Sequence, residues 1–126
     1  MNEQAAIESV IQMYFDASFA GDGRKMAEVF HEAAHIYGLD KNGTLTDWSL
    51  SFFVNLVGSS VSSKSMGLAR RETILSLDFT GENTAVARVS LRVRDTLFTD
   101  ILSFIRLNGK WKIMAKVLSG VPILTG

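Results

Sequence analysis

Apolar residues recur with one spacing in the first half of the chain and with another in the second half. Up to Gly58 they tend to lie three or four positions apart, and from Arg70 onward they alternate with polar residues. The first spacing puts apolar side chains on one face of a helix, and the second puts them on one face of a strand. This order predicts an α+β fold, in which helices pack on one face of a curved, mostly antiparallel sheet.

Three helices are predicted in the first half, with a strand between the second and the third. Asn2 caps the first helix, whose apolar stripe includes Tyr14, and Gly21-Asp22-Gly23 ends it. Asp22 also caps a short second helix. Thr46 is the predicted cap of the third helix, which Gly58 ends and whose apolar stripe consists of Trp48, Phe52, Phe53, Leu56 and Val57.

The second half predicts a four-stranded antiparallel meander. Four alternating runs, TILSLDF, AVARVSLRV, LFTDILSFIRL and KWKIMAKVL, are separated by TGENT, RDT and NG. Asn108-Gly109 is the clearest hairpin signal, because this dipeptide tolerates the positive φ that a tight turn needs. Residues 59–67, SSVSSKSMG, show no periodicity and are predicted to form a loop, either a plain connector or the rim of a cavity.

The turns also predict which strand residues share a face of the sheet. With two-residue loops at Asn108-Gly109 and Asp95-Thr96, Asp100 lies opposite Val117 on one side and opposite Leu91 on the other. Asp100 is then the one charged residue on an apolar face that packs against the helices and contains Ala87, Val89, Leu91, Val93, Phe98, Leu102, Phe104, Ile113, Ala115 and Val117.

A carboxylate on such a face has two interpretations. Asp100 either bonds a helix tyrosine, a tryptophan or a backbone N–H and stabilises the core, or it contacts a bound ligand. Burial in an apolar pocket raises the pKa of a carboxyl group, and a raised carboxyl can transfer protons in an enzyme. Both interpretations remain open from the sequence.

The opposite face of the predicted sheet is half apolar. Ile101, Met114 and small hydroxyl residues lie there among long basic side chains, Lys116 included. Apolar stems beneath charged ends suit a protein interface better than open solvent. We therefore predict a homodimer that forms through this outer face.

Composition excludes several classes of protein. The length of 126 residues predicts one domain, residues 1–126, and the absence of cysteine excludes disulfides and thiolate chemistry. Thirteen basic and thirteen acidic residues cancel, so no nucleic-acid partner is expected. No signal-like start or membrane-spanning apolar run is present, which predicts a cytoplasmic protein without a membrane partner.

Three phrases resemble one known family. VIQMYFDASFAGD, VFHEAAHIYGL and LFTDILSFIRLNGKWKIMAKV occur in the order and spacing typical of the nuclear transport factor 2-like superfamily, which includes SnoaL-like and ketosteroid-isomerase-like proteins. The resemblance is greatest to its putative lumazine-binding family. It implies a cone-shaped α+β barrel with one deep pocket, usually in a dimer. The family's Phe-Thr-Asp phrase falls on Phe98, Thr99 and Asp100, and its Lys-Val on Lys116 and Val117.

The stretch HEAAH, residues 31–35, matches the zinc motif of helical metalloproteases. In the family frame His31 ends the second helix and His35 lies on the strand that follows, which destroys the i, i+4 geometry. The chain has only these two histidines, and the next glutamate is Glu72. We therefore expect no metal site, and contact with a pocket ligand remains open for His35.

The primary functional hypothesis is a small-molecule binding protein with an apolar, aromatic-lined pocket and Asp100 as its polar anchor. The candidate ligand-binding residues are Asp100, Tyr14, His35, Tyr37, Trp48 and Phe52. An alternative is an isomerase or cyclase in which Asp100 is the general acid/base and Tyr14 stabilises the oxyanion. A second alternative is a non-catalytic dimeric scaffold whose cone is filled by side chains. No cofactor is expected in any of these cases.

Overall fold

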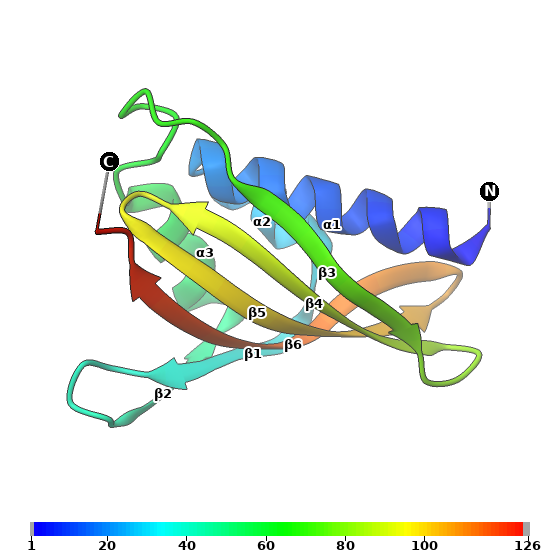
Figure 1. Ribbon diagram of the computed structural model, residues 1–126. Helices are drawn as coiled ribbons and strands as arrows, with labels where there is room; N and C mark the ends of the chain where they lie inside the picture. Colours follow the sequence, from blue (N-terminus) through cyan, green and yellow to red (C-terminus); the bar gives the residue numbers. More distant parts are fainter. Residues whose placement is uncertain (1, 125–126) are drawn as a thin grey trace.

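In the computed structural model, which describes residues 2–124, three helices pack on a six-stranded sheet (Figure 1). Their bounds in chain order are α1 (Glu3–Ala20), α2 (Gly23–Val29), β1 (Phe30–Leu39), β2 (Leu45–Ser49), α3 (Leu50–Ser59), β3 (Glu72–Phe79), β4 (Thr84–Val93), β5 (Thr96–Leu107) and β6 (Lys110–Pro122). The predicted α+β class is confirmed.

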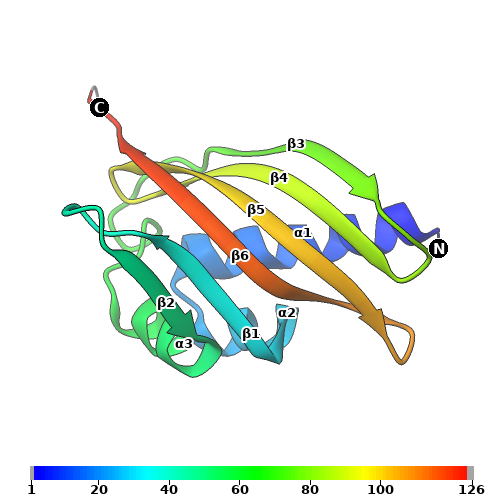
Figure 2. The ribbon, with the colours of Figure 1, turned by 90° about the horizontal axis from the view of Figure 1, so that it is seen from below.

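The sheet is open and curved (Figure 1), and its strand order is β2-β1-β6-β5-β4-β3. All neighbouring strands are antiparallel except β1 and β6, which run parallel. Figures 1 and 2 show that α1, α2 and α3 all lie on the same face of this sheet. The buried core lies between that face and the helices, and Ile7, Ile11 and Tyr14 of α1 are fully buried in it.

The caps of the first two helices are those that the sequence predicts. The Asn2 side chain accepts a hydrogen bond from the Ala5 N–H at 2.7 Å, and Asp22 accepts one from the Lys25 N–H at 3.0 Å. Gly21 ends α1 with a φ of +66°, a left-handed conformation that glycine adopts without steric cost. These caps satisfy backbone N–H groups that the helices leave without partners.

The predicted start of the third helix is wrong. Thr46 lies on strand β2, and the cap of α3 is Ser49, which accepts a hydrogen bond from the Phe52 N–H at 3.2 Å. Trp48 therefore lies on β2, opposite Ile36 of β1, because the turn after β1 brings this segment back along the sheet edge. The predicted end, Gly58, lies one residue before Ser59, the last residue of α3. Pairing with β1 has overridden the helical spacing of this segment.

The predicted register of β5 and β6 holds near the hairpin and fails beyond it. Leu107 pairs with Lys110, and Phe104 pairs with Ile113, as expected. Ser103 then pairs with Ala115, because Met114 is an extra residue in β6, a β-bulge.

This bulge reverses the faces of the residues that follow it. Asp100 lies opposite Leu118 instead of Val117. Val117 faces outward and is 51% exposed, whereas Lys116 faces the helices and is 5% exposed. The predictions that Val117 lies inside and Lys116 outside are therefore wrong.

The turn between β4 and β5 also differs from the prediction. Val93 pairs with Thr96, so the two loop residues are Arg94 and Asp95, and Arg94 has a φ of +54°. Asp100 consequently lies opposite Val89 instead of Leu91. A shift of two residues preserves the face of every side chain. Asp100 therefore faces inward as predicted, and it is 1% exposed.

None of the helices within residues 2–124 has both the length and the apolar character needed to cross a membrane. The cytoplasmic location stays a prediction from composition.

The close packing of α2 against α3 gives a test of the fold. A Cβ added at Gly23 would lie 2.8 Å from the Val54 carbonyl oxygen, whereas one at Gly58 would meet its nearest neighbours at 3.9 Å. We expect Gly23→Ala to destabilise the protein by about 1–3 kcal/mol through overpacking. Gly58→Ala, in the last turn of α3, should stabilise it by up to about 0.5 kcal/mol, since alanine favours a helix over glycine. Urea unfolding measures both, and equal effects of the two substitutions would contradict this packing.

Candidate functional site

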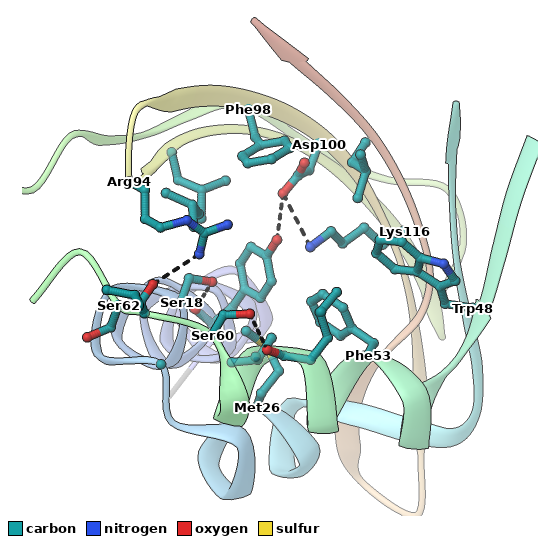
Figure 3. Close-up of a pocket in the computed structure, with 18 residues that line it drawn as sticks. Ser18, Met26, Trp48, Phe53, Ser60, Ser62, Arg94, Phe98, Asp100 and Lys116 are labelled. Carbon is teal, nitrogen blue, oxygen red and sulfur yellow. Dashed lines mark hydrogen bonds and ion pairs between the residues drawn. The ribbon is translucent and has the colours of Figure 1, made fainter. Parts of the chain in front are cut away.

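A cavity of about 210 Å³ lies between the inner face of the sheet and the helices. Its walls are mostly apolar and include Trp48, Phe53, Leu91, Phe98 and Leu118. Figure 3 shows Asp100 and Lys116 reaching into this space from the sheet, with Phe53 and Trp48 beside the lysine. An apolar cavity with a few convergent polar groups is the usual form of a small-molecule site.

Three elements supply the polar centre of the cavity. Tyr14 comes from α1, where the spacing from Ile7 and Ile11 keeps it on the buried stripe. Asp100 comes from β5, on the same face as Leu102. Lys116 comes from β6, and it reaches the cavity because the bulge at Met114 turns its side chain inward.

Tyr14 and Asp100 form a buried hydrogen bond. The Tyr14 hydroxyl donates to Asp100 Oδ2 at 2.5 Å. Burial, and after it the neighbouring charge of Asp100, raises the pKa of Tyr14 well above its ordinary value of 10.0. The phenol therefore remains protonated and serves as a hydrogen-bond donor.

Lys116 is the counter-charge of Asp100. Its Nζ lies 3.9 Å from Asp100 Oδ2, 4.3 Å from the centre of the Phe53 ring and 4.9 Å from that of Tyr14. Burial lowers the pKa of Lys116 below its ordinary value of 10.5, and the attraction of Asp100 opposes this shift. The ring faces of Phe53 and Tyr14 and the carboxylate of Asp100 together stabilise this buried cation.

The second oxygen of the Asp100 carboxylate has no partner. Oδ1 is buried and accepts no hydrogen bond from any residue of the described range 2–124. An unsatisfied buried acceptor costs about 1–3 kcal/mol, more when it is charged. Because Asp100 lines the cavity, a donor on a bound molecule can satisfy this oxygen.

Of the other predicted ligand-binding residues, only Trp48 lines the cavity. Its ring stacks on that of Phe53, with centroids 6.5 Å apart. Phe52 contacts Trp48 from outside the cavity lining and is 51% exposed. His35 and Tyr37 stack on each other at 6.1 Å, also outside the lining. The structure thus brings Tyr14, Trp48 and Asp100 together and leaves the other three residues elsewhere.

The HEAAH stretch is part of strand β1 and not of a helix. His31, expected to end the second helix, lies on the strand, and its Nδ1 accepts a hydrogen bond from the Ala33 N–H at 3.0 Å. His35 Nδ1 lies 2.5 Å from Asp47 Oδ1 on β2. Across the part of the chain that the structure describes, no three His, Asp or Glu side chains gather as metal ligands would.

The serine-rich segment after α3 forms part of the cavity rim. Ser60, Val61 and Ser62 line the cavity, and Arg94 joins them from the β4–β5 turn. Arg94 donates from its guanidinium to the Val61 carbonyl at 3.1 Å, and its backbone N–H donates to the buried Ser63 hydroxyl at 2.7 Å. Of the two interpretations of residues 59–67, the structure favours the rim.

Sequence reasoning missed Lys116 as a member of the site. The family phrase did mark Lys116, but regular pairing from the Asn108-Gly109 turn placed it on the outer face. The family's Lys-Val phrase is the one signal in the sequence that marks Lys116 as a candidate site residue. The alternation of KWKIMAKVL does not indicate the bulge at Met114.

Comparison with known proteins matches the chain to one family and one fold. The family model described as putative lumazine-binding matches residues 2–119. The protein named Aldolase FrzH from Cladobotryum sp. is 23% identical over 123 residues, which cover 96% of this chain and 94% of that protein.

Several solved structures share the fold. An NTF2-like protein of unknown function from Shewanella baltica has a TM-score of 0.87 at 23% identity, covering 95% of this chain and 94% of its own. One from Methylobacillus flagellatus has a TM-score of 0.83 at 26% identity, with 94% and 92% covered. A ketosteroid isomerase-like protein from Erwinia carotovora atroseptica has a TM-score of 0.73 at 13% identity, with 96% and 98% covered.

The buried ion pair can be tested by a double-mutant cycle of Asp100→Asn and Lys116→Met. Each single substitution leaves the partner without its counter-charge and should destabilise the protein by about 3 kcal/mol. The double variant should lose less than the sum, with a coupling of at least about 1 kcal/mol in urea unfolding. The exposed pair of Asp16 and Arg70, 2.7 Å apart, is the control and should couple by less than about 1 kcal/mol. Additive effects at Asp100 and Lys116 would contradict the pairing.

Proposed function

The chain belongs to the putative lumazine-binding family of nuclear transport factor 2-like proteins, and on that premise we propose that it binds a small, flat molecule in the cavity. Asp100 is the polar anchor of this site and Lys116 its second polar contact. The observation that carries the proposal is the unpaired Oδ1 of Asp100, buried in an otherwise apolar cavity.

The size and walls of the cavity favour a ligand of one or two fused rings. A cavity of roughly 150 Å³ holds benzene, and this one has about 210 Å³. Trp48 and Phe53 offer ring faces on which a flat molecule stacks. Larger ligands, such as four-ring steroids, would require the walls to move.

The polar contacts favour a ligand edge with a donor next to an acceptor. Asp100 Oδ1 accepts from an N–H or O–H group, and the Lys116 ammonium donates to a carbonyl oxygen. A cyclic amide has its N–H beside its C=O and complements both residues at once. Lumazine, a two-ring heterocycle with such edges, belongs to this class of ligand.

An isomerase or cyclase-type enzyme is the second candidate function, and Lys116 is the observation that favours it. Asp100 would transfer a proton at a carbon next to a carbonyl group. The predicted oxyanion stabiliser, Tyr14, donates to Asp100 instead, so it positions the acid/base. Lys116 takes the stabilising role, because its ammonium lies beside Asp100 in the apolar cavity. The relative from Cladobotryum is named an aldolase, and at 23% identity it assigns no reaction to this chain.

A third candidate is the non-catalytic scaffold with a filled cone. The cavity between sheet and helices counts against it, because side chains leave about 210 Å³ free there.

We also propose that the protein forms a homodimer through the outer face of the sheet. The bulge in β6 turns Val117 outward, where it lies opposite Ile101 of β5. Together they extend a stripe of exposed apolar residues that consists of Ile101, Ile105, Val117 and Val121, exposed by 36%, 38%, 51% and 57%. A stripe of this kind on a sheet face is typical of a surface that another protein covers.

Ligand binding can be measured by the fluorescence of Trp48. Titration with lumazine and other two-ring cyclic amides should change this emission in the wild type and in Trp111→Phe, which removes the second tryptophan. Asp100→Asn should weaken binding at least about tenfold, or about 1.4 kcal/mol, because the ligand donor loses its charged acceptor. Leu107→Ser, at an exposed residue outside the cavity lining, is the control and should bind normally.

This titration and a hydrogen-exchange experiment in D₂O decide between the candidates. If no flat heterocycle binds at millimolar concentration, the scaffold replaces the binding protein. If a bound ketone exchanges the hydrogen next to its carbonyl with D₂O, and Asp100→Asn stops the exchange, the enzyme is favoured.

The dimer can be tested by sedimentation of the double variant Ile101→Lys/Val117→Lys. We expect a dimer for the wild type and a monomer for the variant, since two buried ammonium groups per subunit oppose association. Met66→Lys, at an exposed apolar residue away from the sheet, is the control and should remain dimeric. A monomeric wild type at high protein concentration would refute this interface.

A further inference from the structure

The amine of Lys116 lies in an environment unlike that of an ordinary lysine. Its side chain is 7% exposed and lines the cavity, with Nζ over the rings of Phe53 and Tyr14. The distance of 3.9 Å to Asp100 Oδ2 is longer than a hydrogen bond, so the two groups interact through charge alone. The amine is therefore positioned by charge and ring contacts and donates no hydrogen bond to Asp100.

These surroundings make the neutral, nucleophilic form of the amine more accessible than it is in an exposed lysine. Burial lowers the pKa of Lys116, and the carboxylate of Asp100 limits the shift. The other titratable groups that line the cavity are Tyr14, on α1, and Arg94, at the rim. Tyr14 is uncharged because its pKa is raised, so Asp100 is the charged group that sets the electrostatics at the amine. Lysines desolvated in apolar pockets are the ones that form Schiff bases with carbonyl compounds.

We propose that Lys116 forms a Schiff base with a small aldehyde or ketone that enters the cavity. This inference rests on the proposed small-molecule site, and it assigns carbonyl compounds to that site as a ligand class. The cavity of about 210 Å³ admits a carbonyl compound with one aromatic ring, which Trp48 and Phe53 can contact.

Asp100 is placed to carry the protons of this reaction. The Lys116 ammonium first gives a proton to the Asp100 carboxylate, which leaves a neutral amine. Its lone pair forms the C–N bond while the π electrons of the C=O bond move to oxygen, and a proton passes from nitrogen to that oxygen. Asp100 then protonates the hydroxyl, and the nitrogen lone pair forms the C=N bond as the C–O bond breaks and water leaves. In sum, ammonium and carbonyl compound give iminium and water, and the iminium charge lies beside the Asp100 carboxylate.

Tyr14 is a positioning residue in this scheme. Its hydroxyl donates to Asp100 Oδ2 and fixes the carboxyl group beside the amine. Oδ1 accepts no hydrogen bond from the described residues, so the carboxylate keeps one oxygen free for the reacting groups.

Reductive trapping tests the proposal in the wild-type chain. The protein is incubated with benzaldehyde and sodium cyanoborohydride near pH 7.5, and each lysine is mapped by peptide mass spectrometry. We expect Lys116 to be labelled at least about tenfold faster than the exposed Lys110, as a lower amine pKa and a binding cavity predict. The selectivity should vanish when the chain is unfolded in urea. The labelling rate at Lys116 should level off at a pH below 10.5.

Matched variants separate a reactive cavity from surface labelling. Lys116→Arg keeps the positive charge and should lose the fast adduct, whereas Lys110→Arg should keep it. Equal labelling of Lys116 and Lys110 in the folded wild type overturns the proposal. If benzaldehyde changes the Trp48 emission at the same time, the binding site stands and only the amine chemistry fails. If the two-ring amides also leave that emission unchanged, the proposed function fails as well.

Discussion

The burial of one carboxylate in an apolar cavity is the constraint on which the rest of this structure depends. Asp100 is 1% exposed, and a lone charge there would be strongly destabilising. Tyr14 from α1 and Lys116 from β6 compensate it by a hydrogen bond and an opposite charge. Helix and sheet are thus joined through a polar centre, and the ligand site that we propose is built around that centre.

A single extra residue in β6, Met114, determines which β6 side chains face the cavity and which face outward. The bulge at Met114 turns Lys116 toward Asp100. Because neighbouring strand residues point to opposite faces, it also turns Val117 outward beside Ile101. Regular pairing would have buried Val117 and exposed Lys116. The cavity chemistry and the apolar outer stripe therefore have one common geometric cause.

The comparison with known proteins agrees with the resemblance seen in the sequence phrases, and the family assignment is confirmed. Within this fold, function depends on which polar groups the cavity holds and not on the cone itself. Here the cavity combines an acid, an amine and a phenol among aromatic rings, a set that can hold a cyclic amide or react with a carbonyl group. The distinction between these roles lies in the protonation and reactivity of Lys116.

The sequence by itself determined the helical stripe that buries Tyr14, the hairpin at Asn108-Gly109 and the inward face of Asp100. These features follow from local periodicity, and an error of two residues in the register of β4 and β5 left the face of Asp100 unchanged. Only the tertiary structure decided that residues 45–49 form a strand and that Lys116 enters the cavity. The pairing of β2 with β1 and the position of β6 between β1 and β5 are contacts between distant segments, which the spacing of neighbouring side chains does not encode.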